Sequence, residues 1–157
     1  MTHITSVARR LEELGISIPR ASPSPAGTYV PAVSSGNLIF TAGQLPFVDG
    51  ALPFTGKVGA EVSLEDAREC ARRSALNALS AVAEVLGSLD RVTRIVKVVG
   101  FVASDPGFTA QPGVIDGASK VLGEIFGDAG VHSRSAVGVA VLPLNSPVEV
   151  ELIVEFS

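Results

Sequence analysis

Two stretches in which hydrophobic and polar residues alternate occupy the region from His132 to Glu155, and each predicts a β-strand. In the first stretch, Arg134 shares one face of the predicted strand with the small residues Ala136, Gly138 and Ala140. In the second stretch, residues 148–156, apolar side chains alternate with glutamates, which predicts one buried face. Two prolines interrupt the segment 142–147 between them. We therefore expect a turn there that joins the two strands as a hairpin.

Three segments carry apolar residues at the spacing typical of helices, and glycines mark their ends. Ser63 precedes the second segment, where its side chain can cap the helix, and Pro112 stands at the start of the third. The predicted helices are 4–14, which ends before Gly15, the segment from the cap Ser63 to Leu86, which ends before Gly87, and the segment after Pro112 to Phe126, which ends before Gly127.

Three further strands complete the pattern. Segments 29–33 and 38–42 flank a Gly36-Asn37 turn and predict a hairpin, and the β-branched run 92–103 predicts a strand that is covered on both faces. The order strand-strand-helix-strand-helix-strand-strand predicts an α+β fold in which two helices cover one face of a mixed sheet. The N-terminal helix and a proline-rich connector make up residues 1–28 of a single domain, 1–157.

Composition excludes several classes of function. The net charge of −4 and an aromatic content of 5% argue against a nucleic-acid partner. Without a run of apolar residues long enough for a membrane span, we expect no membrane association and a cytoplasmic location. The lone Cys70 falls in a helical pattern and should pack as a small apolar residue. His3 and His132 offer no metal-ligand spacing, so we expect no metal site.

Arg134 is the candidate binding residue. A forked guanidinium above a row of small residues would stand at the edge of a hollow, and this group suits a carboxylate ligand. The alternative is a structural ion pair, for instance with one of the glutamates of the following strand. His132, two residues earlier, would share the face of Arg134, either in the same cleft or as a structural histidine.

Two blocks of sequence resemble the Rid family (YjgF, reactive intermediate deaminase). The first is Tyr29-Val30 with Gly36-Asn37-Leu38-Ile39-Phe40-Thr41-Ala42-Gly43-Gln44-Leu45-Pro46, and the second is Arg134-Ser135-Ala136-Val137 followed by Leu142-Pro143 and Val148-Glu149-Val150-Glu151. They lie in the family's order and at compatible spacing. The similarity extends from about Tyr29 to Phe156, so the chain resembles a longer branch with an N-terminal addition.

The resemblance implies a chorismate mutase-like fold and a homotrimer with clefts between subunits. It implies hydrolysis of 2-imino or 2-enamino acids to 2-oxo acids and ammonia, without a metal or organic cofactor. Arg134 would bind the substrate carboxylate, Glu149 would position the attacking water, and the Gly43 N–H, Tyr29 and Ala136 would complete the cleft. Read without the resemblance, Gly43 is an ordinary turn glycine.

The chain departs from the deaminase pattern at three positions. Ala42 stands where active deaminases carry serine, Ala136 stands where they commonly carry cysteine, and Asp116 lies near the position of an asparagine. A carboxylate at position 116 would repel a carboxylate substrate. Two functions therefore remain: an imine deaminase, or a non-catalytic module that binds a small carboxylate in the same cleft. The family's endoribonuclease label conflicts with the acidic charge.

The predicted hairpin also sets the distance between Arg134 and Glu149. Arg134 lies eight residues before Leu142, and Glu149 stands near the start of the returning strand, so the two side chains would lie on the order of 25 Å apart. If both serve one cleft, a neighbouring chain must supply one of them. Otherwise only one of the two is functional.

Overall fold

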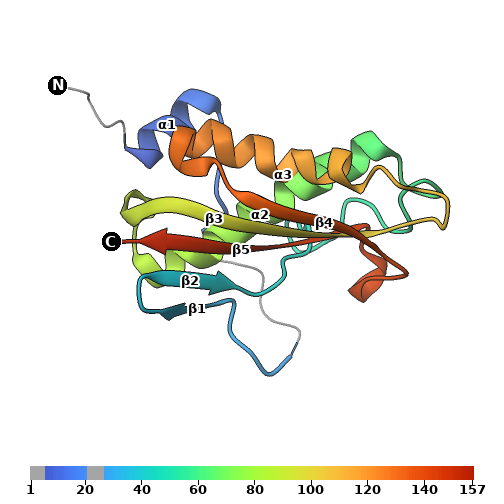
Figure 1. Ribbon diagram of the computed structural model, residues 1–157, viewed down its shortest axis with the longest axis horizontal. Helices are drawn as coiled ribbons and strands as arrows, with labels where there is room; N and C mark the ends of the chain where they lie inside the picture. The colour runs from blue at the N-terminus through green and yellow to red at the C-terminus, as the bar shows by residue number, and fades with distance from the viewer. Residues whose placement is uncertain (1–5, 21–26) are drawn as a thin grey trace.

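The computed structural model describes residues 6–20 and 27–157, and its strands form one five-stranded mixed sheet (Figure 1). The helices are α1 (Val7–Leu14), α2 (Leu64–Leu86) and α3 (Gln111–Phe126), and the strands are β1 (Ala32–Ser35), β2 (Leu38–Thr41), β3 (Val92–Ala103), β4 (Ser133–Val139) and β5 (Val148–Phe156). Short 3-10 turns occupy Leu89–Arg91, Gly127–Gly130 and Pro143–Asn145. The α+β prediction is confirmed.

The pairing of the last two strands differs from the predicted hairpin. The sheet order is β1-β2-β5-β3-β4, so β3 lies between β4 and β5. β4 pairs with β3 in parallel, with Arg134 opposite Val98, whereas β5 pairs with both β2 and β3 antiparallel. The alternation of residues correctly predicted both strands. It held no information about a third strand inserted between them, because that pairing is non-local.

Local signals at the ends of the elements are confirmed. The Ser63 hydroxyl accepts a hydrogen bond from the Asp66 N–H at 3.1 Å and caps α2, and Gly87 ends that helix with a φ of 80°. Gly36 and Asn37 form the two-residue turn between β1 and β2, and the φ of 60° at Gly36 is one that glycine adopts without strain.

Helices α2 and α3 pack together and cover one face of the sheet, with Val98, Val102, Val150 and Leu152 buried beneath them. Their backbones approach closely at Gly117, where a Cβ would lie 2.9 Å from the Arg68 carbonyl carbon. The opposite face of the sheet is open within one chain. We predicted that both faces of β3 are covered, and within one chain this is wrong. On the open face, Val96, Lys97, Val99 and Phe101 are only partly buried.

The N-terminal helix α1 packs beside the end of α3 (Figure 1). The Arg10 Nε–H donates to the Glu124 carbonyl at 2.9 Å, and the Val7 N–H donates to Asp90 Oδ1 at 2.7 Å. Val7, Leu11 and Leu14 are partly buried and pack against the core, whereas the predicted start of this helix at Ile4 lies outside the described residues. Over the described parts of the chain, no helix combines the length and apolar character needed to cross a membrane.

Candidate functional site

Arg134 lies on the edge strand β4 and points to the helix-covered side of the sheet. Its Nη1 donates to Asp116 Oδ1 at 2.7 Å and to the Ser119 hydroxyl at 3.1 Å, and both partners belong to α3. Nε and Nη2 of Arg134 have no protein partner among the described residues, and neither is buried without one. One side of the guanidinium is therefore held by the protein, and the other side faces solvent.

His132 contacts the Ser119 hydroxyl, which is also a partner of Arg134. His132 Nδ1 lies 2.6 Å from the Gly130 carbonyl oxygen, which can only accept, so Nδ1 carries the proton. His132 Nε2 then accepts from the Ser119 hydroxyl at 2.9 Å, and the Ser119 oxygen in turn accepts from Arg134. The relay from guanidinium to hydroxyl to imidazole holds the Arg134 side chain in one orientation.

The predicted hollow beside Arg134 is filled within one chain. A Cβ on Gly138 would lie 2.8 Å from Gln111 Nε2 and 3.1 Å from Ser104 Oγ, and Ala136 packs against the core. The ion pair that we considered as the alternative does form, but with Asp116 and not with a glutamate of β5. The small residues of β4 thus make room for α3 and the loop before it.

Glu149 occupies the open face of the sheet. Its neighbours in β5, Val148 and Val150, are fully buried under the helices, so Glu149 points the other way. Its carboxyl group lies over the main chain of Gly43, where a Cβ would stand 2.8 Å from Glu149 Cδ and closer still to Oε1. Hydrogen bonds between the backbones of Gln44 and Val150, at 2.8 and 3.0 Å, hold the two segments together.

The surroundings of Glu149 favour its protonated form. Burial raises the pKa of the Glu149 carboxyl above the usual 4.5, and the nearby carboxylate of Glu151 raises it further. A carboxylate with a raised pKa is a stronger base, which suits a group that removes a proton from water.

Arg134 and Glu149 do not meet within one chain, although the reason differs from the predicted one. Opposite them in β3 stand Val98 and Phe101, three residues apart, and β3 separates the two strands. Their Cα atoms are therefore roughly 14 Å apart, not about 25 Å. The side chains also point to opposite faces of the sheet, and this alone keeps them apart.

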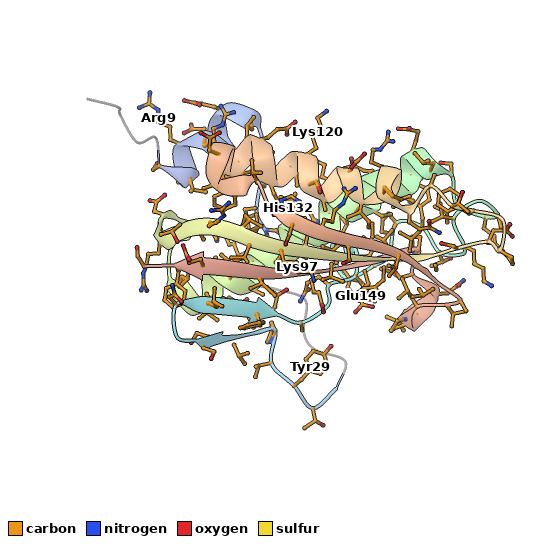
Figure 2. All side chains as sticks on the ribbon, viewed as in Figure 1. Arg9, Tyr29, Lys97, Lys120, His132 and Glu149 are labelled. Atoms are coloured by element: carbon orange, nitrogen blue, oxygen red, sulfur yellow. The ribbon has the colours of Figure 1, made fainter. Side chains whose placement is uncertain are left out.

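The other predicted site residues are dispersed. Tyr29 is half exposed and lies in the segment before β1, far from His132 and nearer to Glu149 (Figure 2). Ala42 is fixed by a 2.8 Å hydrogen bond from its N–H to the Pro31 carbonyl. Within one chain, the predicted residues thus form two separate groups: Glu149 with Gly43, and Arg134 near Ala136.

Sequence reasoning missed the role of Ser119, and it assigned Asp116 only a repulsive effect. The signal available was their three-residue spacing on a predicted helix, which places both side chains on one face. Nothing local indicated that this face would meet Arg134. No group of three or more His, Cys, Asp or Glu side chains among the described residues could hold a metal ion.

Comparisons with known proteins agree with the fold. Protein TCP17 of Trypanosoma cruzi is 43% identical over 152 residues, which cover 96% of this chain and 94% of that protein. The 2-iminobutanoate/2-iminopropanoate deaminase of Escherichia coli is 31% identical over 132 residues, which cover 84% of this chain and 90% of the enzyme. The crystal structure of Atu1372 from Agrobacterium tumefaciens, a protein of unknown function, matches with a TM-score of 0.89 at 42% identity, covering 96% of this chain and 92% of that one.

The family model for YjgF/chorismate mutase-like proteins matches residues 8–156, which is nearly the whole chain and includes most of α1. This match agrees with the two sequence blocks, the order of the strands and the relatives named above. The chain belongs to the YjgF/chorismate mutase-like family.

Proposed function

We propose that this protein hydrolyses 2-imino acids to 2-oxo acids and ammonia in a cleft formed between copies of the chain. The observation that carries the proposal is the Glu149 carboxyl group, which lies against the Gly43 main chain on the open sheet face and has a raised pKa. The 2-iminobutanoate/2-iminopropanoate deaminase of Escherichia coli, 31% identical to this chain, carries the name of this reaction.

The chemistry needs few groups, because the carbon of a protonated imine is already electrophilic. Glu149 accepts a proton from water while the water oxygen bonds to the imine carbon, and the C=N π electrons move to nitrogen. Glu149 then returns its proton to that nitrogen, and as the C–N bond breaks and ammonia leaves, the hydroxyl oxygen gives up its proton to Glu149 and becomes the carbonyl oxygen of the 2-oxo acid. Water and the iminium ion supply all atoms of the products, so neither a metal nor an organic cofactor is required.

Arg134 is the proposed partner of the substrate carboxylate. Its Nε and Nη2 present two parallel N–H groups to solvent, a geometry that matches both oxygens of a carboxylate. The bonds of Nη1 to Asp116 and Ser119 fix the plane of the guanidinium before a ligand arrives. Tyr29 and Ala136 are proposed to line the cleft, and the Gly43 N–H to assist in binding.

A homotrimer would bring the two groups together. Val33, Phe40 and Val137 are large apolar side chains on the open sheet face, with exposures of 52%, 39% and 44%. Burying such a face favours association. Since Arg134 and Glu149 point to opposite faces, a closed ring can place Glu149 of one copy against Arg134 of the next.

A non-catalytic module that binds a small carboxylate is the second candidate. The observation that favours it is Asp116, which already pairs with Arg134 at 2.7 Å. The missing hydroxyl at Ala42 points the same way, because one polar group of the deaminase pattern is absent.

One assay separates the two functions. An amino-acid oxidase generates 2-imino acids in the presence of the protein, and release of ammonia, or competition with semicarbazide, reports hydrolysis. The deaminase proposal expects a rate above background that Glu149→Gln abolishes. A rate equal to background for a series of small imino acids, with retained carboxylate binding, would establish the binding module instead.

A further inference from the structure

The pairing of Arg134 with Asp116 bears on which ligands the site accepts. Asp116 Oδ1 is engaged by Arg134 Nη1, while Oδ2 has no hydrogen-bond partner among the described residues. The Asp116 side chain is 59% exposed and the Arg134 side chain 24%. A ligand on the solvent side of the guanidinium thus meets a cation and an available carboxylate oxygen side by side.

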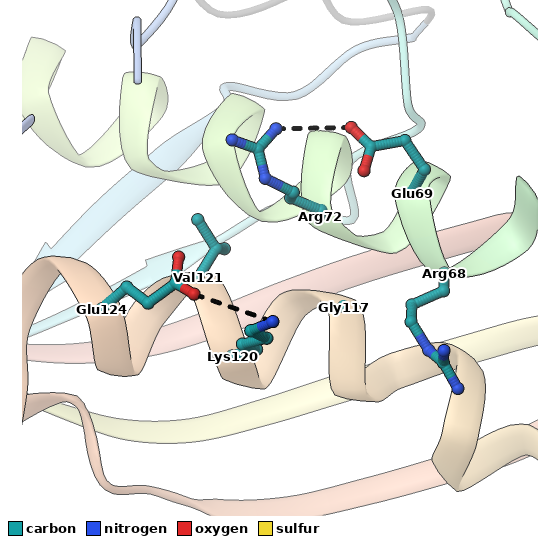
Figure 3. A pocket seen from close by; sticks show the side chains of 7 residues that line it. All are labelled: Arg68, Glu69, Arg72, Gly117, Lys120, Val121 and Glu124. Carbon is teal, nitrogen blue, oxygen red and sulfur yellow. Dashed lines mark hydrogen bonds and ion pairs between the residues drawn. The ribbon is translucent and has the colours of Figure 1, made fainter. Parts of the chain in front are cut away.

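Nearby charges leave the site without a net excess of cations. A surface hollow next to the pair is lined by Arg68, Asp116, Ser119 and Lys120. Arg68 pairs with Glu65 at 2.8 Å, and Lys120 pairs with Glu124 at 4.0 Å (Figure 3 draws the second pair). The three cations of this region each face a carboxylate.

A site in which each cation is paired with a carboxylate should bind anions and zwitterions with different affinities. A monoanion that binds Arg134 brings a second negative charge beside Asp116, and the repulsion offsets part of the gain. A zwitterion with a positively charged nitrogen next to its carboxylate brings no net charge. Its nitrogen can donate to Asp116 Oδ2 while its carboxylate occupies the Arg134 fork.

We propose that Asp116 is a specificity-determining residue, which makes the Arg134 site select ligands that carry a cationic nitrogen beside a carboxylate over plain carboxylates. The inference rests on the proposed function and deepens it. The iminium form of a 2-imino acid is a net-neutral zwitterion, whereas the 2-oxo acid product is a monoanion. Hydrolysis removes the nitrogen that Asp116 recognises, so the site binds its product more weakly than its substrate.

Stable ligands test this selectivity without turnover. L-2-aminobutanoate and L-2-hydroxybutanoate share shape and carboxylate but differ in the charged nitrogen, and 2-oxobutanoate represents the product. Calorimetric titration of the full chain should show the amino acid binding about tenfold more tightly than the hydroxy acid or the oxo acid. In Asp116→Asn, the amide oxygen can still accept from Arg134 Nη1, so the orientation of the guanidinium is kept. There the preference should vanish, and the two monoanions should bind more tightly than they do to the parent.

The matched control is Glu12→Gln, which removes one exposed carboxylate from α1 and should leave all three affinities unchanged. Equal affinities of the parent for the three ligands, an Asp116→Asn protein with an unchanged ratio, or no binding of any of them in the millimolar range would each overturn the inference. Imine hydrolysis by the parent is measured alongside. If the parent hydrolyses imines but the ratio of its affinities for the amino acid and the hydroxy acid is the same in Asp116→Asn, the proposed function stands and the inference fails. If that ratio depends on Asp116 but no imine is hydrolysed, the selectivity stands and the proposed function fails.

Discussion

Glu149 lies so close to the main chain of Gly43 that no side chain fits between them. A Cβ on Gly43 would stand 2.8 Å from Glu149 Cδ, inside the contact distance of two carbon atoms. The φ of Gly43 is not positive, so the requirement for glycine is one of space and not of backbone conformation. The glycine therefore sets the position of the carboxyl group.

Replacing Gly43 by alanine should displace Glu149 and reduce imine hydrolysis. A misplaced catalytic group typically costs on the order of 10²-fold in rate. The control is Gly123→Ala in α3, where no atom lies within 4 Å of the added Cβ; that change should stabilise the helix by about 0.5–1 kcal/mol and leave the rate unchanged. An unaltered kcat in a folded Gly43→Ala protein would show that the position of Glu149 is not critical.

Glu149→Gln should stabilise the protein at neutral pH. The pKa of Glu149 is raised in the folded state, so the folded chain holds this proton more tightly than the unfolded chain does. Ionised Glu149 thus costs stability above its folded pKa, and stability recovers as the pH falls through that pKa toward 4.5. Since the side chain keeps some contact with solvent, we expect a gain on the order of 0.5 kcal/mol.

Thermal melts of the parent and Glu149→Gln between pH 4 and neutral pH measure the effect. The difference in Tm should be largest at neutral pH and should disappear as the parent becomes protonated. Glu12→Gln, exposed on α1, should show no such trend. A parent that is more stable than Glu149→Gln at neutral pH would contradict the raised pKa.

Arg134→Ala should weaken carboxylate binding with little loss of stability. Lost hydrogen bonds between charged groups cost about 1.5–3 kcal/mol, which corresponds to roughly ten- to hundredfold in affinity. The fold should tolerate the change, because the 59% exposed Asp116 side chain regains water. Arg72→Ala, which removes a surface pair with Glu69, is the matched control and should bind the ligand like the parent.

Mixed oligomers test whether one cleft draws on two copies. Arg134→Ala and Glu149→Gln proteins, each inactive alone, should recover part of the activity after joint dissociation and reassembly, since some clefts then hold both intact residues. A monomeric mass by sedimentation, or no recovery from verified mixed oligomers of an active parent, would rule out the shared site.

Cys70 should resist alkylation in the folded protein. Its side chain is 1% exposed, and burial raises the pKa of the thiol to about 12, with Asp66 and Glu69 adding to the effect. Iodoacetamide at pH 8 should therefore label the thiol only after denaturation. Rapid stoichiometric labelling of the native protein, followed by mass spectrometry, would show that this region of α2 opens readily.

Features set by neighbouring residues were predictable from the sequence. The Ser63 cap, the Gly87 stop and the Gly36-Asn37 turn depend on a few adjacent positions, and each is found where expected. The alternation in residues 148–156 also correctly predicted that Val148, Val150, Leu152 and Val154 face the core.

Features set by pairing between distant segments were not predictable. The parallel contact of β4 with β3 depends on residues about 36 positions apart, and no local pattern encodes it. The same applies to the contact of Arg134 with Asp116 and Ser119, which exists because α3 lies over β4. From charge alone we expected Asp116 to repel a carboxylate substrate, whereas in the structure Asp116 is the counter-ion of Arg134.

The position of β5 between β2 and β3 has a consequence for synthesis of the protein. β5 follows every other strand in chain order, yet it fills the centre of the sheet. While the chain emerges from the ribosome, β1-β2 and β3-β4 can form only as separate pairs, and the edges of β2 and β3 that later pair with β5 stay unsatisfied. The sheet closes in a single late step, when Val148–Phe156 enters between them. Until that step, both nascent edges are open to chaperones and to pairing with other chains.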